Sequence, residues 1–378
     1  MNILTIPKEL QLHIIGLLRV PDRLRLSETC HALKDLVRDP SLWKQLVLCY
    51  KRIRDNTEAC RDQVSRCSKL RDLSICSKLR DLSICSCILP WNNAENYEGR
   101  IRSDKIMNVV MKAKSSIKTL TVRKFRLSNS SFKQLSQLTQ LTHLNINARN
   151  IRSDGIAGLA KLSELRSLKL YNFRHGHFIL SNNLKSLEDV FSILKKLEVV
   201  EMRDYDQLSD EAIENLVVSN PNLHHLDINS TSAWYGIPKL TSKTLSIIAD
   251  TCPQITHIDI GHLTVFTNDD LIKFASKCSK LKYANFEDTR IEDSALERLA
   301  SDCPNLEHLK LSNCLLITEQ GTEAFLNKAA KAQLKSLDIR DCHFLRDDKN
   351  GSIPDRFEAA HPHIDVVDYD DWGYSPIV

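Results

Sequence analysis

The sequence predicts an α/β fold in which stacked strand–turn–helix units follow a short helical segment. A motif of the form L-x-x-L-x-L recurs through the second part of the chain at intervals of 24 to 32 residues. A Ser or Thr followed by apolar residues at helical spacing comes after most copies of this motif. The first fifty residues instead carry apolar side chains at helical spacing alone. These observations predict a helical N-terminal region and a repeat region of parallel strands and helices.

Each copy of the apolar motif predicts a strand. Its last two apolar positions are two residues apart, so a strand points both side chains to the same face. Ten segments fit the motif, with these starting residues: IKTLTVR (117), LTHLNIN (141), LRSLKLY (165), LEVVEMR (197), LHHLDIN (223), ITHIDIG (255), LKYANFE (281), LEHLKLS (306), LKSLDIR (334) and IDVVDY (364). The last copy is short, which predicts a terminal capping unit.

The segment that follows most strands predicts a helix. A Ser or Thr just before the first apolar residue can accept hydrogen bonds from the free N–H groups of the first helical turn. Glu292 stands at this place in one unit and predicts a weaker or different cap. The predicted caps are Ser128, Ser153, Ser209, Thr241, Thr267 and Thr318.

The period and the motif resemble those of the leucine-rich repeats. One unit alone cannot bury both its strand face and its helix face, so the resemblance implies a curved solenoid with parallel strands on the concave side and helices on the convex side. The cysteines resemble those of the cysteine-containing subclass, because Cys252, Cys278 and Cys303 precede a strand by three residues and Cys314 and Cys342 follow one by three. We expect buried thiols here, since a zinc site needs paired ligands at short spacing.

The first fifty residues predict three short helices. Leu10, Ile14, Leu17 and Leu18 form one apolar helical face, and Pro21-Asp22 and Asp39-Pro40 mark breaks. A second apolar helix is predicted from Leu24, Leu26, Cys30 and Leu33. About 45 residues form only a marginal core, so these helices either dock on the repeats or carry a partner surface.

This segment resembles an F-box. The resemblance is carried by Ile6-Pro7, Glu9-Leu10, Ile14, Leu17-Leu18, Asp22, Cys30 and Asp39-Pro40-Ser41-Leu42-Trp43, with Ile6 in place of the usual Leu. Followed by the repeats, the whole chain resembles the F-box/leucine-rich-repeat proteins. The resemblance predicts an F-box domain at residues 1–50, a linker at 51–66 and about ten repeats at 67–378.

The resemblance implies a non-catalytic receptor subunit of an SCF ubiquitin ligase. In that family the F-box binds the Skp-type adaptor of a cullin-RING ligase core, and the repeats hold a protein substrate for ubiquitination and proteasomal degradation. An apolar cluster with an aromatic residue is typical of an interface hot spot, although the same side chains can also hold three helices together. By position, the adaptor-facing residues are Ile6, Pro7, Leu10, Ile14, Leu17, Leu18, Leu24, Leu42 and Trp43.

The concave face offers candidate substrate-binding residues. The third motif position gives His225 and His257, and the fifth gives Glu201, Asp227 and Asp259 on three consecutive strands. This acidic row favours a cationic partner segment, with a solvated polar face as the alternative. The His-x-Asp pairs, and His175-Gly-His177, have the residue types of a metal site. Nothing brings these side chains to one point, so we expect no metal and no cofactor.

Two of the longest intervals place extra residues after their strands, at 171–183 and 230–239. Both insertions leave from the same end of their strands, so we expect them on one rim of the solenoid, where loops often carry binding residues. Trp234 and Tyr235 are the candidate aromatic anchors for the substrate. Packing of these loops against a neighbouring repeat is the alternative.

Residues 67–85 contain the nine-residue sequence CSKLRDLSI twice. Nine residues leave no room for a helix, so the two copies compete for one strand. We expect the second copy, with Leu82 and Ile84, to form the first strand of the solenoid, followed by a helix near 103–113. The first copy would then be an irregular insertion. The reverse assignment is the alternative, because both copies carry the same core residues.

Composition and charge narrow the function classes. The net charge of +4 over 378 residues does not indicate nucleic-acid binding. Residues 100–126 are basic and 338–371 acidic, which predicts solvated faces or a polar partner surface. No apolar run approaches the ~20 residues that cross a bilayer, and MNILTIPKEL lacks signal-peptide features. We therefore expect no membrane partner, and reduced cysteines in the cytoplasm or nucleus.

Catalytic motifs are not found in the sequence. No nucleophile elbow, phosphate loop, zinc-protease helix or paired-carboxylate motif occurs. The leading hypothesis is the substrate receptor. The alternative is a leucine-rich-repeat binding or inhibitory scaffold that acts outside the ligase, and an enzyme is the third hypothesis.

Overall fold

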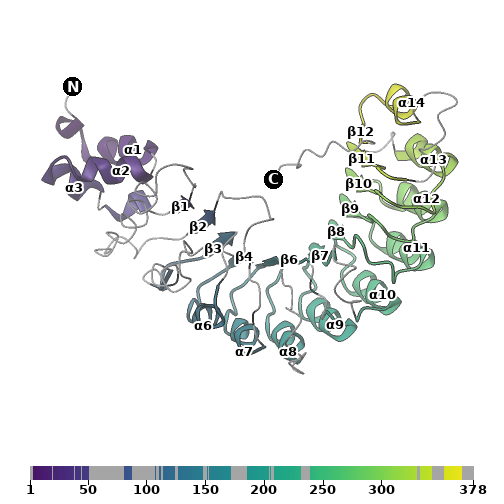
Figure 1. Cartoon of the computed structure of the whole chain (residues 1–378), viewed down its shortest axis with the longest axis horizontal. Coiled ribbons are helices and arrows are strands. Elements are labelled where there is room, and N and C mark those ends of the chain that lie inside the picture. Colours follow the sequence, from purple (N-terminus) through teal and green to yellow (C-terminus); the bar gives the residue numbers. More distant parts are fainter. Residues whose placement is uncertain are drawn as a thin grey trace, which may run out of the picture. The chain divides into compact units, whose positions relative to one another are not determined.

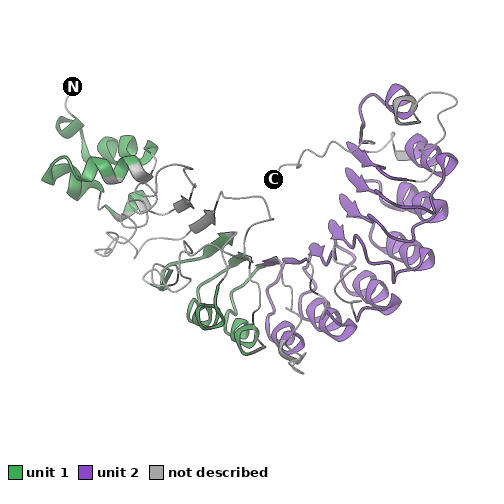
Figure 2. Cartoon of the chain, viewed as in Figure 1, with its two compact units in different colours: residues 1–168 green, residues 169–378 purple. Residues whose placement is uncertain are grey.

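The computed structural model divides the chain into two compact units, residues 1–168 and 169–378 (Figure 2). The residues that the structure describes are 3–18, 20–37, 39–43, 45–50, 81–86, 107, 110–111, 114–123, 127–147, 151, 153–171, 185–203, 205, 208–230, 239–329, 333–342 and 353–367.

The first unit begins with three helices, α1 (Lys8–Leu17), α2 (Val20–Ser27) and α3 (His31–Val37) (Figure 1). Short 3-10 turns flank them at Ile3–Thr5 and Pro40–Trp43. The predicted second helix is in fact two helices, because the chain breaks after Ser27 and restarts at His31. Pro21 lies in the first turn of α2, where its missing N–H costs no hydrogen bond. Cys30 lies exposed between the two helices.

One side chain ties these helices together. The guanidinium of Arg23 on α2 donates to the carbonyl of Leu18 at 2.8 Å, to that of Leu42 at 2.6 Å, and to that of Gly16. Carbonyls in the last turn of a helix have no partner within the helix, so Arg23 supplies the donors that the end of α1 lacks. It also fixes the 3-10 turn that carries Leu42, which is buried with Ile15, Leu36 and Val37.

The other described residues of the first unit form strands and short helices. The strands β1, β2, β3 and β4 pair in chain order and in parallel. Their bounds are β1 (Gln45–Tyr50), β2 (Asp81–Ser86), β3 (Thr119–Arg123) and β4 (His143–Asn147), and β5 (Ser167–Tyr171) follows at the division between the units. The helices are α6 (Asn129–Gln134) and α7 (Ser153–Ala157), each continued by a 3-10 turn, at Leu135–Gln137 and Gly158–Lys161.

The structure decides between the two copies of the duplicated sequence. The second copy forms β2, as predicted, and Met107 and Val110 in the predicted helix region after it are helical and fully buried. The first copy lies outside the described residues. The prediction that β2 is the first strand is wrong, because β1 precedes it and pairs Leu46 with Leu82 and Leu48 with Ile84. The sheet therefore begins inside the range predicted for the F-box domain.

The second unit is a regular α/β solenoid with its strands on one side and its helices on the other (Figure 1). All its strands pair in parallel with their chain neighbours. They are β6 (Val199–Met202), β7 (His225–Asp227), β8 (His257–Asp259), β9 (Tyr283–Asn285), β10 (His308–Lys310), β11 (Ser336–Asp338) and β12 (Asp365–Val367). The helices are α8 (Lys185–Ile193), α9 (Asp210–Ser219), α10 (Ser242–Thr251), α11 (Asn268–Lys277), α12 (Asp293–Asp302), α13 (Glu319–Ala329) and α14 (Ile353–Ala360). All ten predicted strand segments form strands.

The predicted cysteines are buried free thiols, as expected. Burial raises the pKa of Cys252 to about 11 and that of Cys278, Cys303, Cys314 and Cys342 to about 12. These thiols link neighbouring units, since Cys303 Sγ donates to the carbonyls of Ala275 and Cys278. They are core residues of the solenoid.

Five of the six predicted caps accept a hydrogen bond from a backbone N–H in the first turn. Ser128, Ser209, Thr241, Thr267 and Thr318 do so, and Thr267 forms a full capping box with Asp270. Ser153 instead stands at the first position of α7. Glu292 caps α12 without a side-chain hydrogen bond, as predicted.

A carboxylate or amide in the first turn of a helix also reaches the cap of the next helix. Asp210 accepts from the N–H and the hydroxyl of Thr241, and from the hydroxyl of Thr244. Asp293 does the same for Thr318, and Asn268 Oδ1 accepts from the N–H of Glu292. The helices are therefore coupled by repeated polar contacts at their N-terminal ends.

The Asp210→Ala variant is expected to lose about 1–2 kcal/mol of unfolding free energy, because three donors of the next unit lose their acceptor. The neighbouring Glu211→Ala variant is the control, since Glu211 is exposed and such surface changes stay within about 0.5 kcal/mol. Denaturant unfolding of both variants measures the difference. Equal midpoints for the two variants would contradict the role given to Asp210.

Candidate functional site

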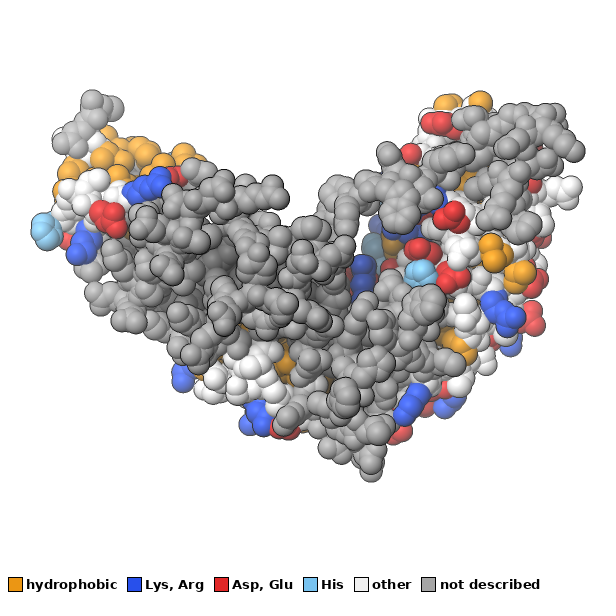
Figure 3. Space-filling model, in the orientation of Figure 1, with side chains coloured by type: hydrophobic (Ala, Val, Ile, Leu, Met, Phe, Trp, Pro, Cys, Tyr) orange, Lys and Arg blue, Asp and Glu red, His pale blue; other side chains and the backbone are white. Residues whose placement is uncertain are grey.

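The described residues present two surfaces with functional character, and the first is the outer face of α1. Leu10, Ile14, Leu17 and Leu18 are 53, 42, 75 and 36 % exposed, whereas Ile15 on the other side of the helix is fully buried. Together with Leu4 they make up five of the nine large apolar side chains that are exposed among the described residues. Figure 3 shows hydrophobic side chains gathered over the N-terminal helices, at the upper left. We call Leu4, Leu10, Ile14, Leu17 and Leu18 the apolar face of α1.

The other predicted adaptor-facing residues are placed differently. Ile6 is partly exposed and Pro7 is exposed beside the start of α1. Leu42 is buried, 3.8 Å from the position that a Cβ on Gly16 would take. The side chains of Leu24 and Trp43 lie outside the described part of the chain. The surface available to a partner is thus carried by α1 and the residues just before it.

The second surface is the strand side of the second unit. Glu201, Asp227 and Asp259 stand side by side on β6, β7 and β8, in register, as the motif predicts. Their side chains are nevertheless buried, with residue exposures of 5, 1 and 5 %. The expected row therefore forms, but a partner does not meet its carboxylates directly.

Cations of this same chain cover the acidic row. Lys169 Nζ lies 2.5 Å from Glu201 Oε1, and Arg203 Nε lies 2.5 Å from Asp227 Oδ2. Arg203 also lies 3.9 Å from Asp259, and His225 Nε2 lies 3.2 Å from Glu201. These contacts remove the physical basis for a cationic partner segment on the row, since its charges are largely satisfied from within.

Burial changes the pKa of one carboxyl group in the acidic row. Desolvation and the neighbouring Asp259 raise the pKa of Asp227 to about 7, against the opposing pull of Arg203. The native protein therefore holds this proton more tightly than the unfolded chain does. The stability from the protonated carboxyl is complete below the unfolded pKa near 4 and is lost as the pH rises toward 7.

The Asp227→Asn variant is expected to gain stability relative to the parent protein as the pH rises from 5 to 8, on the order of a few kcal/mol. The amide stays neutral throughout, and its oxygen can still accept the Asn229 N–H that Asp227 Oδ1 accepts. Thermal unfolding midpoints of both proteins across this range measure the effect. Parallel curves would show that Asp227 ionises normally.

A row of stacked rings lies beside the acidic row. The rings of His225 and His257 are 5.2 Å apart at 13°, and those of His257 and Tyr283 are 6.0 Å apart at 18°. Burial, followed by His225, lowers the pKa of His257, so its ring is neutral at neutral pH. We call His225, His257 and Tyr283 the ring row.

The hydrogen bonds of Thr256 determine which ring nitrogen of His257 carries the proton. The hydroxyl of Thr256 donates its one proton to the carbonyl of His224 at 3.0 Å. His257 Nδ1 lies 2.8 Å from that oxygen, so it must donate. The neutral ring therefore keeps a free acceptor at Nε2.

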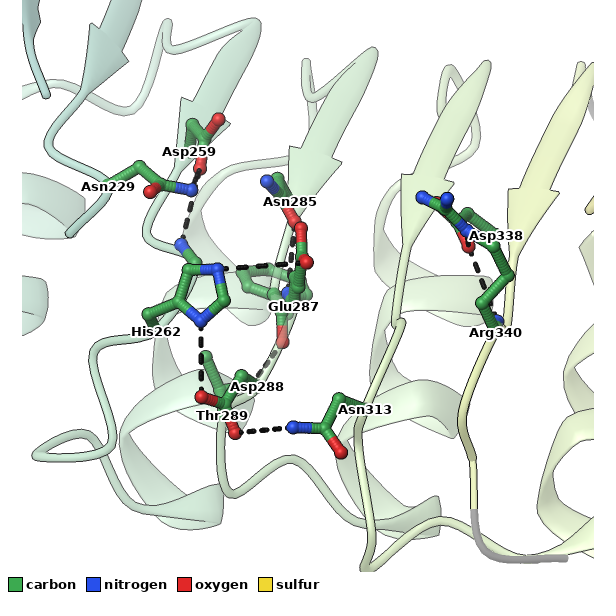
Figure 4. Close-up of polar contacts among 12 residues, drawn as sticks. Asn229, Asp259, His262, Asn285, Glu287, Asp288, Thr289, Asn313, Asp338 and Arg340 are labelled. Carbon is green, nitrogen blue, oxygen red and sulfur yellow. Dashed lines mark hydrogen bonds and ion pairs between the residues drawn. The ribbon is translucent and has the colours of Figure 1, made fainter. Parts of the chain in front are cut away.

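The strand ends continue into a row of left-handed turn residues. His262, Asp288, Asn313 and Asp341 have φ values of 61, 49, 57 and 56°, at equivalent positions of successive units. Figure 4 shows His262 beside Asp288 and Asp288 beside Asn313, with Nδ1–Oδ2 and Nδ2–Oδ1 distances of 3.1 and 3.0 Å. Asp, Asn and His tolerate this conformation better than most residues, and the side chains tie the turns together.

Several predicted site residues lie outside the described part of the chain, namely Trp234, Tyr235, His175 and His177. Within the described residues no three His, Cys, Asp or Glu side chains are grouped to hold a metal ion. No helix among the same residues is both long and apolar enough to cross a membrane.

The sequence interpretation missed the residues that cover the acidic row. Arg203 stands at the seventh motif position, which points to the same face as the fifth. A basic residue there, next to an acid on the following strand, was the available signal. Tyr283 stands at the third motif position of the next strand, like His225 and His257 on theirs. It therefore lies on the same face and extends the ring row by one strand.

Comparisons with known proteins found similarity to a family of N-terminal domains and to a repeat protein. Residues 3–49 match the F-box-like family model. The F-box/LRR-repeat protein 4 of Bos taurus is 26% identical over 103 residues, which are 27% of this chain and 16% of that protein. The match thus spans about one sixth of the relative's length.

The fold also has a solved counterpart. A chain from the crystal structure of the Rad7 and Elc1 complex in yeast aligns with a TM-score of 0.53 and 15% identity, over 89% of this chain and 76% of that one. With an F-box-like segment at residues 3–49 and strand–helix repeats after it, the chain is similar to the F-box/leucine-rich-repeat proteins.

Proposed function

We propose that this chain is the substrate receptor of an SCF-type ubiquitin ligase, acting in the cytoplasm or nucleus. The observation that carries the proposal is the apolar face of α1, which leaves Leu17 75 % exposed inside a segment that matches the F-box-like family. Isolated exposed apolar side chains are ordinary, but a cluster on one helix face indicates a partner.

The partner proposed for this face is a Skp-type adaptor, which would connect the chain to a cullin-RING core. Apolar side chains at i, i+4 and i+7 are the spacing at which a helix docks into an apolar groove. The structural neighbour comes from a complex of Rad7 with Elc1, which supports a protein-binding role for this architecture. Leu24, Leu42 and Trp43 stay in the proposed adaptor region, with Leu42 as a buried support.

The repeats are the proposed substrate-binding region. A concave sheet with the ring row and polar side chains offers a continuous surface to an extended partner segment. The proposed contacts are His225 and His257 of the ring row, with Glu201, Asp227 and Asp259 as the layer that positions Arg203 and Lys169. Trp234 and Tyr235 remain proposed anchors on the rim. The chain itself would carry out no chemistry, since ubiquitin transfer belongs to other subunits.

A proximity-labelling experiment tests the receptor role against that of a scaffold outside the ligase. Full-length chain and its Leu17→Asp variant are each fused to a labelling enzyme and expressed in cells. A receptor directs its bound proteins to degradation, so the proteins labelled by Leu17→Asp should be several-fold more abundant than those labelled by the parent. Val218→Asp, which changes a 63 % exposed side chain on α9, is the matched control. Equal abundance with all three proteins would favour the scaffold.

A further inference from the structure

We infer that the strand side of the second unit binds an acidic segment of the substrate, and that Lys310 on β10 holds one carboxylate or phosphate group of that segment. This inference rests on the proposed substrate-receptor function and names the class of segment that the receptor takes. The acidic row by itself would favour a partner of the opposite charge, but a partner that reaches this face meets its cations first.

Acids and cations occupy different depths on the strand side. The strands carry four acids that are at most 5 % exposed, namely Glu201, Asp227, Asp259 and Asp338. The cations that pair with these acids are more exposed, at 30, 41 and 33 % for the side chains of Lys169, Arg203 and Arg340. Burial also raises the pKa of Asp227 to about 7, which reduces the negative charge of the buried layer. The outer layer that a partner contacts is therefore mainly basic.

Lys310 differs from the other cations of this face because no described acid neutralises it. It stands in register with Asn285 on β9, which is neutral, and with Asp338 on β11. Arg340 binds both oxygens of Asp338, through Nε at 2.9 Å and Nη2 at 2.7 Å (Figure 4). Lys310 is partly exposed, and its ammonium forms no ion pair or hydrogen bond with a described residue. Its charge thus lacks a counterion within the described part of the chain.

A buried hydroxyl without a partner lies two residues further along the same face. Ser312 is 4 % exposed, and its Oγ has no hydrogen-bond partner among the described residues. Its backbone runs beside that of Arg340, whose carbonyl accepts the N–H of Asn313 at 2.7 Å. Residues two apart on a strand lie roughly 7 Å from each other. Because no hydrogen bond holds the Ser312 hydroxyl in its rotamer, it can turn toward an oxygen that Lys310 binds, and buried polar groups are nearly always paired.

Two acids that follow β9 are engaged by other side chains. Glu287 is 32 % exposed, and its Oε1 lies 3.6 Å from His262 Nε2. His262 follows β8, which pairs with β9 on the side opposite to β10, so Glu287 turns away from Lys310. Asp288 accepts from Asn313 at 3.0 Å and lies 3.1 Å from His262 Nδ1 (Figure 4). Lys310 therefore remains available to an anion from outside the described chain.

Covering this face selects the charge of the partner. A substrate segment that lies over β10 removes water from the Lys310 ammonium, and an ammonium that loses water without gaining a counterion is strongly disfavoured. A neutral segment leaves this penalty in place, and a basic segment adds repulsion from Lys310, Arg203 and Arg340. An anionic oxygen instead forms a charge-assisted hydrogen bond. The carboxylates of Asp and Glu and the phosphates of modified Ser, Thr and Tyr share this chemistry.

The test selects random twelve-residue peptides on the purified full-length chain, in two arms. One arm uses unmodified peptides, and the other places a phosphoserine at the centre of each peptide. The same selections are made on Lys310→Gln, which removes the charge and keeps most of the side chain. Lys273→Gln is the matched control, because Lys273 is exposed on α11 and undergoes the same change. Ser312→Ala tests the hydroxyl, and thermal unfolding checks that every variant is folded.

Peptides selected on the parent and on Lys273→Gln are expected to share an acidic residue at a fixed position or to require the phosphoserine. The first result identifies a carboxylate and the second a phosphate, and both support the inference. Lys310→Gln should bind a selected peptide at least tenfold more weakly, and Ser312→Ala several-fold more weakly. Replacing the acidic residue by Gln, or the phosphoserine by Ser, should weaken binding to the parent about tenfold and cause little further loss with Lys310→Gln.

Three results overturn the inference: no peptide recovered from the parent, selected peptides without an anionic group at a fixed position, or equal losses from the peptide change in the parent and in Lys310→Gln. Unchanged binding by Ser312→Ala overturns the contact assigned to its hydroxyl. Adaptor binding by the parent is measured separately. A parent that binds the adaptor but selects no acidic peptide contradicts this inference alone, whereas a parent that does not bind the adaptor contradicts the receptor function.

Discussion

The Asn220→Ala variant is expected to lose about 3 kcal/mol of unfolding free energy in the second unit, which is the largest stability effect predicted for a single side chain of the repeats. Asn220 is 1 % exposed and uses both ends of its amide. Its Oδ1 accepts from the N–H of Leu197 at 2.7 Å, and its Nδ2 donates to the carbonyls of Leu194 and Leu216 at 2.9 Å each.

Leu197 explains why this residue matters. In later units the first residue of the motif donates its N–H to the carbonyl three residues earlier, as Ile255 does to Cys252 and Leu281 does to Cys278. Leu197 instead donates to Asn220 of the next unit. Alanine would leave this buried N–H without an acceptor, and the cost of an unpaired buried group exceeds the gain from an average hydrogen bond.

Two further variants serve as comparisons for Asn220→Ala. Asn222→Ala changes an exposed residue and should alter stability by no more than about 0.5 kcal/mol. Asn220→Cys copies the residue of later units, so its thiol can still donate to the Leu194 carbonyl but cannot accept from Leu197, and an intermediate loss is expected. Denaturant unfolding followed by circular dichroism measures all three variants. A loss below 1 kcal/mol in Asn220→Ala would contradict the role of Asn220 as a link between units.

The second large effect is expected from Arg23→Ala, which should destabilise the N-terminal helices by about 2–4 kcal/mol. The guanidinium donates to three carbonyls of α1 and the 3-10 turn, and hydrogen bonds to a charged group contribute about 1.5–3 kcal/mol. A segment this small buries little apolar surface, so the loss is a large share of its stability.

Arg23→Ala should change the hydrogen-exchange rates of the first unit and leave those of the second unit unchanged. Amides of α1 and α3 should exchange faster in the variant, while those of α10 to α13 keep their protection. Arg25→Ala is the control, because Arg25 is two-thirds exposed and forms an ion pair with Asp22 three residues earlier. Unchanged protection of α1 in Arg23→Ala would show that the apolar core alone holds these helices.

The strand motif predicted the fold well because its apolar positions all lie within one short segment of the chain. Each copy became a strand in register with its neighbours, and the second copy of the duplication became β2. β1 was missed because its motif begins with Trp43 rather than Leu, before Leu46 and Leu48. The second N-terminal helix was predicted as one from Leu24 to Leu33, whereas the chain ends α2 at Ser27 and begins α3 at His31.

The candidate sites could be predicted from the sequence only where all their side chains lie on one helix or strand. The apolar face of α1 could be read from helical spacing, because a single helix sets which side chains share a face. The burial of Asp227 could not, because Arg203 of the preceding unit, which pairs with it, becomes its neighbour only after folding.

The most direct test of the central claim is the affinity of the purified full-length chain for a purified Skp-type adaptor, measured by calorimetry. The parent chain should bind, and Leu17→Asp should lose at least 2 kcal/mol of binding free energy, as expected for a hot-spot residue. Leu315→Asp, which alters a 53 % exposed leucine of the repeats, should bind like the parent. Adaptor binding that is absent in the parent, or unchanged in Leu17→Asp, would contradict the account.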